Sequence, residues 1–141
     1  MTDLLRCCGS RRWAEAMAAA APFGNEHELL RASDEIWWKL DVEDWLEAFR
    51  AHPRIGERST SALSQQEQAG TATATPEQFA ELERLNGEYE KRFGYIFIIR
   101  AAGRTTEEML QALRQRLSNS PEVEIRVAAE QQNQITRLRL K

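Results

Sequence analysis

The sequence has few cysteines, and this scarcity excludes several kinds of small protein. Cys7 and Cys8 are the only two, and they are adjacent. Neighbouring cysteines rarely pair with each other without strain, and the CxxC spacing of many zinc and redox sites is missing. A chain of this length buries about two-thirds of the surface that its unfolded form exposes, so folding requires no disulfide. We therefore expect a protein of a reducing compartment, with the cytoplasm as its default location.

An excess of positive charge and a long apolar run are lacking as well. The 19 lysine and arginine residues face 22 aspartate and glutamate residues, so the basic footprint of a nucleic-acid-binding protein is absent. No stretch approaches the roughly 18 apolar residues of a membrane span, and the N-terminus lacks the apolar core of a signal peptide. We expect neither a nucleic-acid partner nor a membrane partner.

Motifs that bind phosphate or metal are also missing. The sequence has no Gly-rich phosphate loop and no HExxH, and only one of its two histidines stands near the candidate carboxylates. We therefore predict no metal and no cofactor, and a small molecule as the binding partner.

Helical periodicity runs through almost the whole chain. Apolar residues recur at intervals of three and four over residues 29–40, and again over residues 42–49 after a capping Asp41. Pro53 stops the second of these helices, because the proline ring removes a donor and the residue before it avoids the α region. His52 is therefore predicted at the C-terminal end of a helix.

The second half contains three further helix starts. Thr75-Pro76-Glu77 begins a helix that is predicted to run from about residue 76 to 92. A capping box from Thr105 to Glu108 begins another helix that ends near Leu117. Ser120-Pro121-Glu122 opens the last helix.

One short segment does not fit a helix. Residues 95–99 are apolar and rich in β-branched and aromatic side chains, which favours a buried extended segment. The Ala-rich residues 14–21 form a helix suited to close packing, and no repeat or linker is visible. We predict an all-α fold: a single domain over residues 1–141, built as a compact bundle of about seven helices with one short extended buried segment.

The stretch His-Pro-Arg-Ile-Gly-Glu at residues 52–57 is the part of the sequence that looks most like chemistry. A histidine whose pKa is tuned around neutrality can act as a general acid or base, so His52 is a candidate for that role. A protonated imidazole at the end of a helix also complements the helix dipole by about 0.3–1 kcal/mol. Both interpretations of His52 stay open. The other histidine, His27, is expected on the surface.

A second polar stretch follows at residues 64–68. Ser64 and Glu67 have the spacing of a capping box, which explains the carboxylate in purely structural terms and is favoured by the motif alone. A carboxylate in the first turn of a short helix can also face the histidine. Gln65, Gln66 and Gln68 add amides that donate and accept at once, which suits a urea-like ligand.

The extended segment is a third candidate. The side chains of Phe97, Ile98 and Ile99 are expected in the core. Its backbone groups have no sheet ladder to join in an all-α protein, so they need other partners, and a bound polar heterocycle is one candidate. Arg100 and Arg104 can neutralise an anionic substrate, although solvated surface arginines are commoner.

Together these motifs resemble the family of 2-oxo-4-hydroxy-4-carboxy-5-ureidoimidazoline (OHCU) decarboxylases of uric acid degradation, over essentially the whole chain. The order of the matching pieces is specific, whereas no single piece is. In chain order they are Cys8-Gly9-Ser10 with Trp13, His52-Pro53-Arg54-Ile55-Gly56, Glu67-Gln68-Ala69-Gly70, Leu85-Asn86 with Tyr89-Glu90, Arg92-Phe93-Gly94-Tyr95-Ile96-Phe97, and Arg137-Leu138-Arg139-Leu140.

The resemblance implies an all-α, cofactor-free enzyme, usually a homodimer, that converts OHCU into (S)-allantoin and carbon dioxide. It implies that His52 is the catalytic proton donor and that Glu67 is the second catalytic group. A C-terminal arginine, Arg137 or Arg139, is a further candidate contact. The implied substrate-binding residues are Pro53, Ser64, Gln65, Gln66, Glu67, Gln68, Phe97, Ile98, Ile99, Arg100 and Ala101.

Two positions depart from the pattern of the family. Leu63 stands where many members carry tryptophan, and Arg100 stands where a small or apolar residue is common. These departures leave open a paralogous decarboxylase that acts on a related ureido heterocycle. A non-catalytic helical binding module is a further alternative, against which the intact His52, Glu67 and Gln68 argue.

Overall fold

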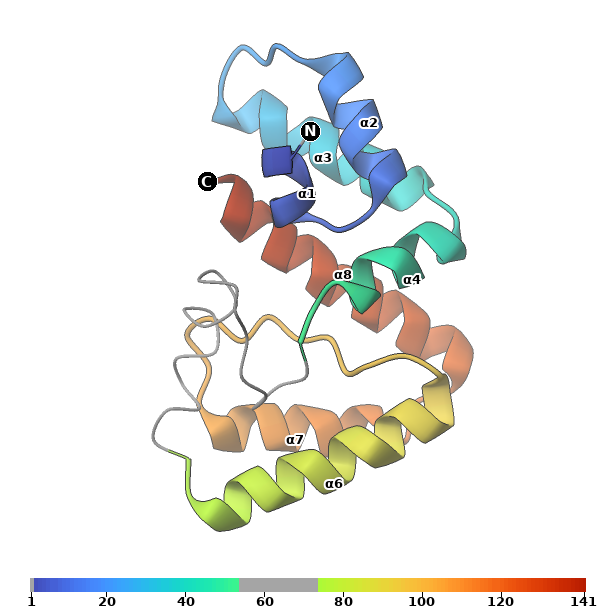
Figure 1. The fold of residues 1–141 in the computed structure, drawn as a ribbon, viewed down its shortest axis with the longest axis vertical. Coiled ribbons are helices and arrows are strands. Elements are labelled where there is room, and N and C mark those ends of the chain that lie inside the picture. The colour runs from blue at the N-terminus through green and yellow to red at the C-terminus, as the bar shows by residue number, and fades with distance from the viewer. Residues whose placement is uncertain (1, 54–73) are drawn as a thin grey trace. The chain divides into compact units, whose positions relative to one another are not determined.

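The computed structural model describes residues 2–53 and 74–141, and these residues form helices without a strand. This confirms the predicted all-α class, including the extended segment between two of the helices. The helices are α1 (Thr2–Cys7), α2 (Arg11–Ala20), α3 (Glu26–Lys39), α4 (Val42–Arg50), α6 (Pro76–Phe93), α7 (Thr106–Arg116) and α8 (Pro121–Leu140), drawn in Figure 1.

The chain divides into two compact units. The first unit is Met1–Ala51 with Gln132–Lys141, and the second unit is His52–Gln131. Helix α8 therefore gives its first part to the second unit and its last turns to the first. The single domain over residues 1–141 stays a prediction.

Three buried tryptophans organise the core of the first unit. The indole nitrogen of Trp13 donates to Ser33 Oγ at 3.1 Å, and that of Trp45 donates to the backbone oxygen of Trp37 at 3.0 Å. A buried indole has one donor to satisfy, and both of these donors have a partner. Trp37 and Trp45 also lie with their ring centroids 5.9 Å apart. The helical faces predicted over residues 29–40 and 42–49 supply this core.

The second unit is built on α6 and α7, which lie side by side with the extended segment packed on them (Figure 1). Capping boxes begin both helices at the predicted residues, Thr75 and Thr105. The helix α6 ends one residue beyond the predicted 92, where Gly94 takes a φ of 86° and donates its N–H to Glu90 O at 2.9 Å. The core of this unit comprises Leu82, Leu85, Tyr89, Phe97, Ile99, Ala101, Met109, Leu110 and Leu113.

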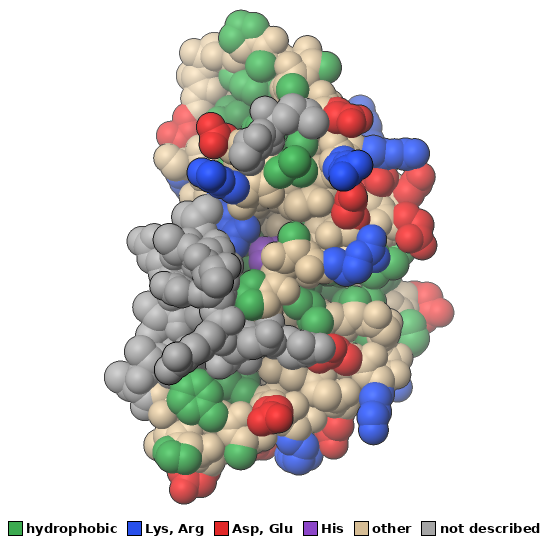
Figure 2. Space-filling model, in the orientation of Figure 1, with side chains coloured by type: hydrophobic (Ala, Val, Ile, Leu, Met, Phe, Trp, Pro, Cys, Tyr) green, Lys and Arg blue, Asp and Glu red, His purple; other side chains and the backbone are tan. Residues whose placement is uncertain are grey.

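The surface mixes charges of both signs. Figure 2 shows lysine and arginine side chains interspersed with aspartate and glutamate on the face that it presents. His27 is exposed, as predicted. Phe79 is 39% exposed, because it lies in the first turn of α6, ahead of the buried row that begins at Leu82. Within residues 2–53 and 74–141, no helix is long and apolar enough to span a bilayer.

Candidate functional site

Helix α4 leads the chain to His52. A capping box between Asp41 and Asp44 begins the helix, and the backbone N–H of Ala51 closes it on Ala48 O at 3.2 Å. His52 and Pro53 follow at once, and both are half-buried. The predicted position of His52 at the end of a helix is confirmed, and its catalytic role stays a prediction.

The Cys-Gly-Ser motif packs against the end of α4. Ser10 caps α2 by accepting from Trp13 N at 3.2 Å. At Gly9, an added Cβ would lie 2.6 Å from the Cβ of Ala51 and 3.6 Å from backbone atoms of Ala48. Glycine is therefore required at this position by close approach. Gly9 thus contacts Ala51, the residue that directly precedes His52 in the chain.

The second polar stretch lies outside the described residues. Leu63 and the candidate residues Ser64, Gln65, Gln66, Glu67 and Gln68 all fall within residues 54–73. Their predicted roles, including Glu67 as a catalytic group or a capping residue, stay predictions.

The extended segment is buried, as predicted. Phe97, Ile98, Ile99 and Ala101 each expose 4% or less of their surface, whereas Arg100 is half-buried. The segment belongs to the second unit together with His52 and Pro53. Burial alone does not test whether these residues bind substrate, so that role stays a prediction.

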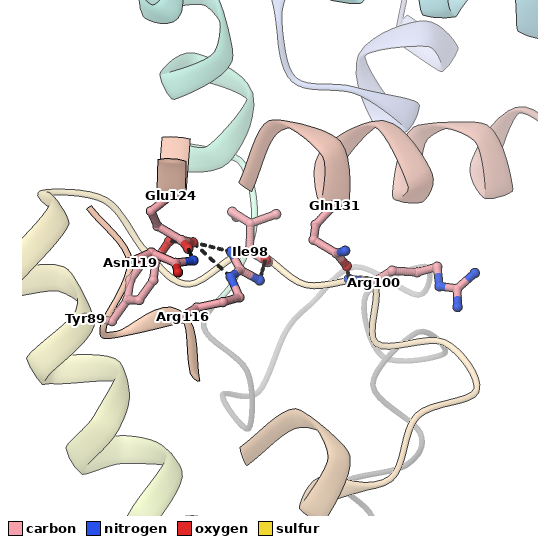
Figure 3. A network of polar contacts seen from close by, with 7 residues as sticks. All are labelled: Tyr89, Ile98, Arg100, Arg116, Asn119, Glu124 and Gln131. Carbon is pink, nitrogen blue, oxygen red and sulfur yellow. Dashed lines mark hydrogen bonds and ion pairs between the residues drawn. The ribbon is translucent and has the colours of Figure 1, made fainter. Parts of the chain in front are cut away.

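Side chains from α7 and α8 supply the hydrogen bonds that a sheet would otherwise give to this segment. Arg116 Nη1 donates to Ile98 O at 2.7 Å, and Arg100 N donates to Gln131 Oε1 at 2.9 Å (Figure 3). Arg100 O in turn accepts from Arg104 Nε at 2.8 Å. The expectation that these backbone groups need partners outside a sheet is confirmed, and the partners of these three are side chains of the protein itself.

A buried ion pair holds Arg116. Its guanidinium donates to Glu124 Oε2 through Nη2 at 2.6 Å and through Nε at 2.9 Å, and the two side chains are 9% and 0% exposed. Asn119 Nδ2 donates to Glu124 Oε1 at 3.0 Å, and the Tyr89 hydroxyl donates to Glu124 Oε2. The guanidinium also lies 4.4 Å from the centroid of the Phe97 ring. Both carboxylate oxygens of Glu124 are therefore engaged.

The tyrosines next to this pair remain protonated. Burial raises the pKa of Tyr89 well above its ordinary value, the nearby Arg116 opposes this rise, and the hydrogen bond to Glu124 adds to it. Burial likewise raises the pKa of Tyr95 to about 12. At neutral pH the Tyr89 hydroxyl is therefore a fixed donor to Glu124.

Sequence reasoning missed this network, although one signal was available. Arg116 continues the row of Met109 and Leu113 at the helical spacing of the α7 core face. A charged residue on such a face is rarely fully buried without a partner. The position of Arg116 therefore predicts a buried acid, but the identity of Glu124 comes only from the fold.

The side chain of Arg100 has a buried donor without a hydrogen-bond partner in the described part of the chain. Its Nε is buried and has no hydrogen-bond partner among the described residues, whereas Arg104 Nε is already taken by Arg100 O. Most buried polar atoms have a partner, and a donor on a cation is costly to leave without one. The arrangement suits an anionic group beside Arg100.

The two C-terminal arginine candidates lie in the first unit. Arg137 Nη1 contacts Asp34 Oδ2 at 2.6 Å, and Arg139 Nη1 donates to Arg6 O at 3.0 Å. Asn133 Nδ2 shares the same aspartate at 3.1 Å. A substrate contact by either arginine stays a prediction.

Comparison with known proteins gives a consistent result. A family profile described as OHCU decarboxylase matches residues 1–141. The uric acid degradation bifunctional protein TTL of Arabidopsis thaliana is 40% identical over 143 residues, which cover 95% of this chain and 44% of that protein. The 2-oxo-4-hydroxy-4-carboxy-5-ureidoimidazoline decarboxylase of Amia calva is 33% identical over 134 residues, with 90% and 77% covered.

The chain spans only part of its bifunctional relatives. It covers 44% of the Arabidopsis protein and 26% of the bifunctional protein PucL of Bacillus subtilis, to which it is 33% identical over 130 residues. A crystal structure of an OHCU decarboxylase in the presence of (S)-allantoin superposes with a TM-score of 0.90 at 40% identity, covering 99% of this chain and 95% of that one.

Proposed function

This chain belongs to the OHCU decarboxylase family, and we propose that it converts OHCU into (S)-allantoin and carbon dioxide in uric acid degradation. The observation that carries the proposal is the similarity over nearly the full length, at a TM-score of 0.90, to an OHCU decarboxylase crystallised with (S)-allantoin. The buried extended segment and the half-buried His52 in one compact unit support it.

The substrate carries its own electron acceptor. Breaking the bond to the carboxylate releases carbon dioxide and leaves an electron pair on the ring carbon, and the adjacent ring C=N bond accepts this pair. The ring nitrogen that receives the pair takes up one proton. Protonation of the carbon that bears the ureido group, with loss of the hydroxyl proton, then gives allantoin. One proton is consumed overall, so the reaction needs an acid and a base but no external electron sink.

His52 and Glu67 divide the proton transfers in this proposal. His52 donates the proton that reaches the planar intermediate, because an imidazole can exchange protons near neutral pH. Glu67 engages the hydroxyl or the ureido N–H groups of the substrate. Protonation from one face alone gives the S configuration, and the fixed orientation of the substrate contributes much of the rate.

Three further parts of the proposal concern the whole protein. It works without a cofactor, as a homodimer, in the cytoplasm. Dialysis against a chelator should leave the rate unchanged, and light scattering should give twice the mass of one chain. Loss of activity on dialysis, or the mass of a single chain, would contradict the corresponding part.

The first experiment generates OHCU in place from urate with uricase and hydroxyisourate hydrolase. Absorbance follows the disappearance of OHCU, and circular dichroism follows the appearance of (S)-allantoin. We expect acceleration over spontaneous decay and one enantiomer. A rate equal to spontaneous decay, or a racemic product, would overturn the proposed function.

The variant His52→Asn tests the proton donor. Asparagine keeps a polar side chain but cannot transfer a proton at neutral pH, so most of the activity should be lost while far-ultraviolet circular dichroism stays unchanged. His27→Asn is the matched control, because His27 is exposed in the first turn of α3. Wild-type turnover in His52→Asn would exclude the assigned role.

The variant Glu67→Gln separates the two interpretations of the carboxylate. A capping box accepts glutamine in place of glutamate, so a purely structural Glu67 would lose little rate. If Glu67 is catalytic, the Glu67→Gln variant loses most of the reaction rate without a drop in melting temperature, and this is the expected result. Glu77→Gln, in the first turn of α6, controls for the loss of one acid in a first helical turn.

A further inference from the structure

We propose that Arg116 and Gln131 are positioning residues, which hold one edge of residues 97–101 so that the opposite edge, at Ile99, is presented to the substrate. The inference rests on the proposed function, because it concerns how the same site binds its ligand. Neither residue is expected to touch the substrate.

The pattern of hydrogen bonds along the segment carries the inference. In an extended chain, residues two apart direct their N–H and C=O groups to the same edge, and the residue between them directs its groups to the other edge. Ile98 O is held by Arg116 at 2.7 Å, and Arg100 N is held by Gln131 at 2.9 Å. Both bonds therefore lie on one edge, and the N–H and C=O of Ile99 lie on the other.

The free edge has the chemistry of a ureido receptor. Within residues 2–53 and 74–141, neither the N–H nor the C=O of Ile99 has a hydrogen-bond partner, although the residue as a whole, backbone included, is only 4% exposed. A buried backbone pair of this kind requires a donor and an acceptor together. A ureido or imide group offers both at the spacing of a peptide.

Arg116 is fixed firmly enough to act as such a clamp. Two of its nitrogens bind Glu124 and a third binds Ile98 O (Figure 3). Its guanidinium carbon also lies 4.4 Å from the centroid of the Phe97 ring. This use of the planar fork is specific to arginine, because lysine has a single point of charge. Moving Arg116 would therefore break the ion pair and the backbone bond together.

Gln131 provides the cleaner experimental handle. It is half-buried and holds the segment through one hydrogen bond from Arg100 N, so its replacement leaves no buried charge without a partner. Gln131→Met keeps the length of the side chain and removes the carbonyl acceptor. Gln131→Glu keeps an acceptor oxygen. Gln111→Met, at an exposed position of α7, is the matched control.

The expected result is a change in substrate binding rather than in turnover. The ureido arm is bound alike before and during the reaction, so a looser segment raises KM and leaves kcat largely unchanged. Loss of one hydrogen bond corresponds to about a tenfold rise in KM for Gln131→Met. Gln131→Glu should stay near wild type, and the Arg100 amide should exchange its hydrogen faster only in Gln131→Met.

Arg116 is tested in a double variant, since the loss of one partner from a buried ion pair is strongly destabilising. Arg116→Met with Glu124→Met removes both charges and also the partner of Ile98 O. We expect this variant to show a cooperative melting transition, as a folded protein does, and a raised KM, as expected for Gln131→Met.

The outcomes separate this inference from the proposed function. A wild-type KM in Gln131→Met would overturn the inference, whether or not the Arg100 amide exchanges faster. A fall in kcat at unchanged KM, with a lower melting temperature, would show a purely structural role and overturn it as well. A wild-type protein that does not accelerate the reaction would instead overturn the proposed function.

Discussion

Arg100, a candidate site residue at which the sequence departs from the pattern of the family, has a bonded backbone and a side-chain donor without a partner among the described residues. Its backbone N–H and C=O are both engaged, so its backbone is fixed independently of its side chain. The buried Nε has no partner among the described residues and is thus a ready donor to an anion. The substrate in the proposed reaction carries a carboxylate, and the product does not.

This difference gives a prediction for Arg100→Gln. If Arg100 binds the carboxylate, KM for OHCU should rise about tenfold or more, because hydrogen bonds to charged groups are the stronger ones. Inhibition by (S)-allantoin, which lacks the carboxylate, should change little. Steady-state kinetics with allantoin as the inhibitor measures both.

The control for Arg100→Gln is Arg126→Gln, at an exposed position of α8. It removes the same charge from an exposed side chain that takes part in neither backbone hydrogen bond of Arg100. A parallel rise in KM and in the allantoin inhibition constant would show that Arg100 acts on the ureido part of the ligand instead.

At the scale of a helix, α6 offers two glycines in opposite circumstances. Gly94 has a φ of 86°, in the left-handed region that L side chains rarely adopt. Gly87 lies inside the helix, and an added Cβ there would meet nothing within 4 Å. The same substitution should therefore have opposite effects at the two positions.

We predict that Gly87→Ala stabilises the protein and that Gly94→Ala destabilises it. Alanine in a helix interior is favoured over glycine by about 0.5–1 kcal/mol, whereas a side chain in the left-handed region costs about 1–2 kcal/mol. Urea denaturation of both variants measures the two changes in the free energy of unfolding. A loss of stability in Gly87→Ala would reveal a contact at that position.

The boundaries of the helices were predictable because their causes are local. Thr75 and Thr105 accept from the backbone N–H three residues later, and Pro76 and Gly94 mark the two ends of α6. Each signal operates within one turn of the chain. The predicted ends of α6 and α7 were therefore correct to within about a residue.

The partners inside the site were not predictable for the opposite reason. Arg116 meets Ile98, and Gln131 meets Arg100, across separations of 18 and 31 residues. Periodicity places a residue on a helical face but does not say what faces it. The candidate substrate-binding residues came from the resemblance to the family, and all of them stay predictions, with those at positions 64–68 outside the described residues.

At the scale of the whole molecule, each unit contains a buried acid that resists ionisation. Burial raises the pKa of the Cys8 thiol from 9.0 to about 11 in the first unit, and raises that of Tyr95 from 10.0 to about 12 in the second. In both cases the folded state binds the proton more tightly than the unfolded state does. The resulting stability is complete below the unfolded pKa and is lost as the pH rises towards the folded one.

We therefore predict alkaline destabilisation in two windows. The melting temperature should fall from about pH 9 to 11, where Cys8 is ionised in the unfolded state and still protonated in the folded state, and from about pH 10 to 12, where the same holds for Tyr95. Calorimetry across this range measures the fall. Cys8→Ala should reduce the slope in the first window and Tyr95→Phe that in the second, where the raised pKa of Tyr89 also contributes. An unchanged slope in either variant would exclude that group as a cause.

The close contact between Gly9 and Ala51 has a consequence for how this sequence can vary. A Cβ at position 9 would overlap the Cβ of Ala51 at 2.6 Å, so a side chain at one position requires its absence at the other. Substitutions at the two positions are therefore coupled, although the positions are distant in the chain. In a library that randomises both positions and is selected for turnover, active variants with a residue other than glycine at position 9 should carry glycine at position 51.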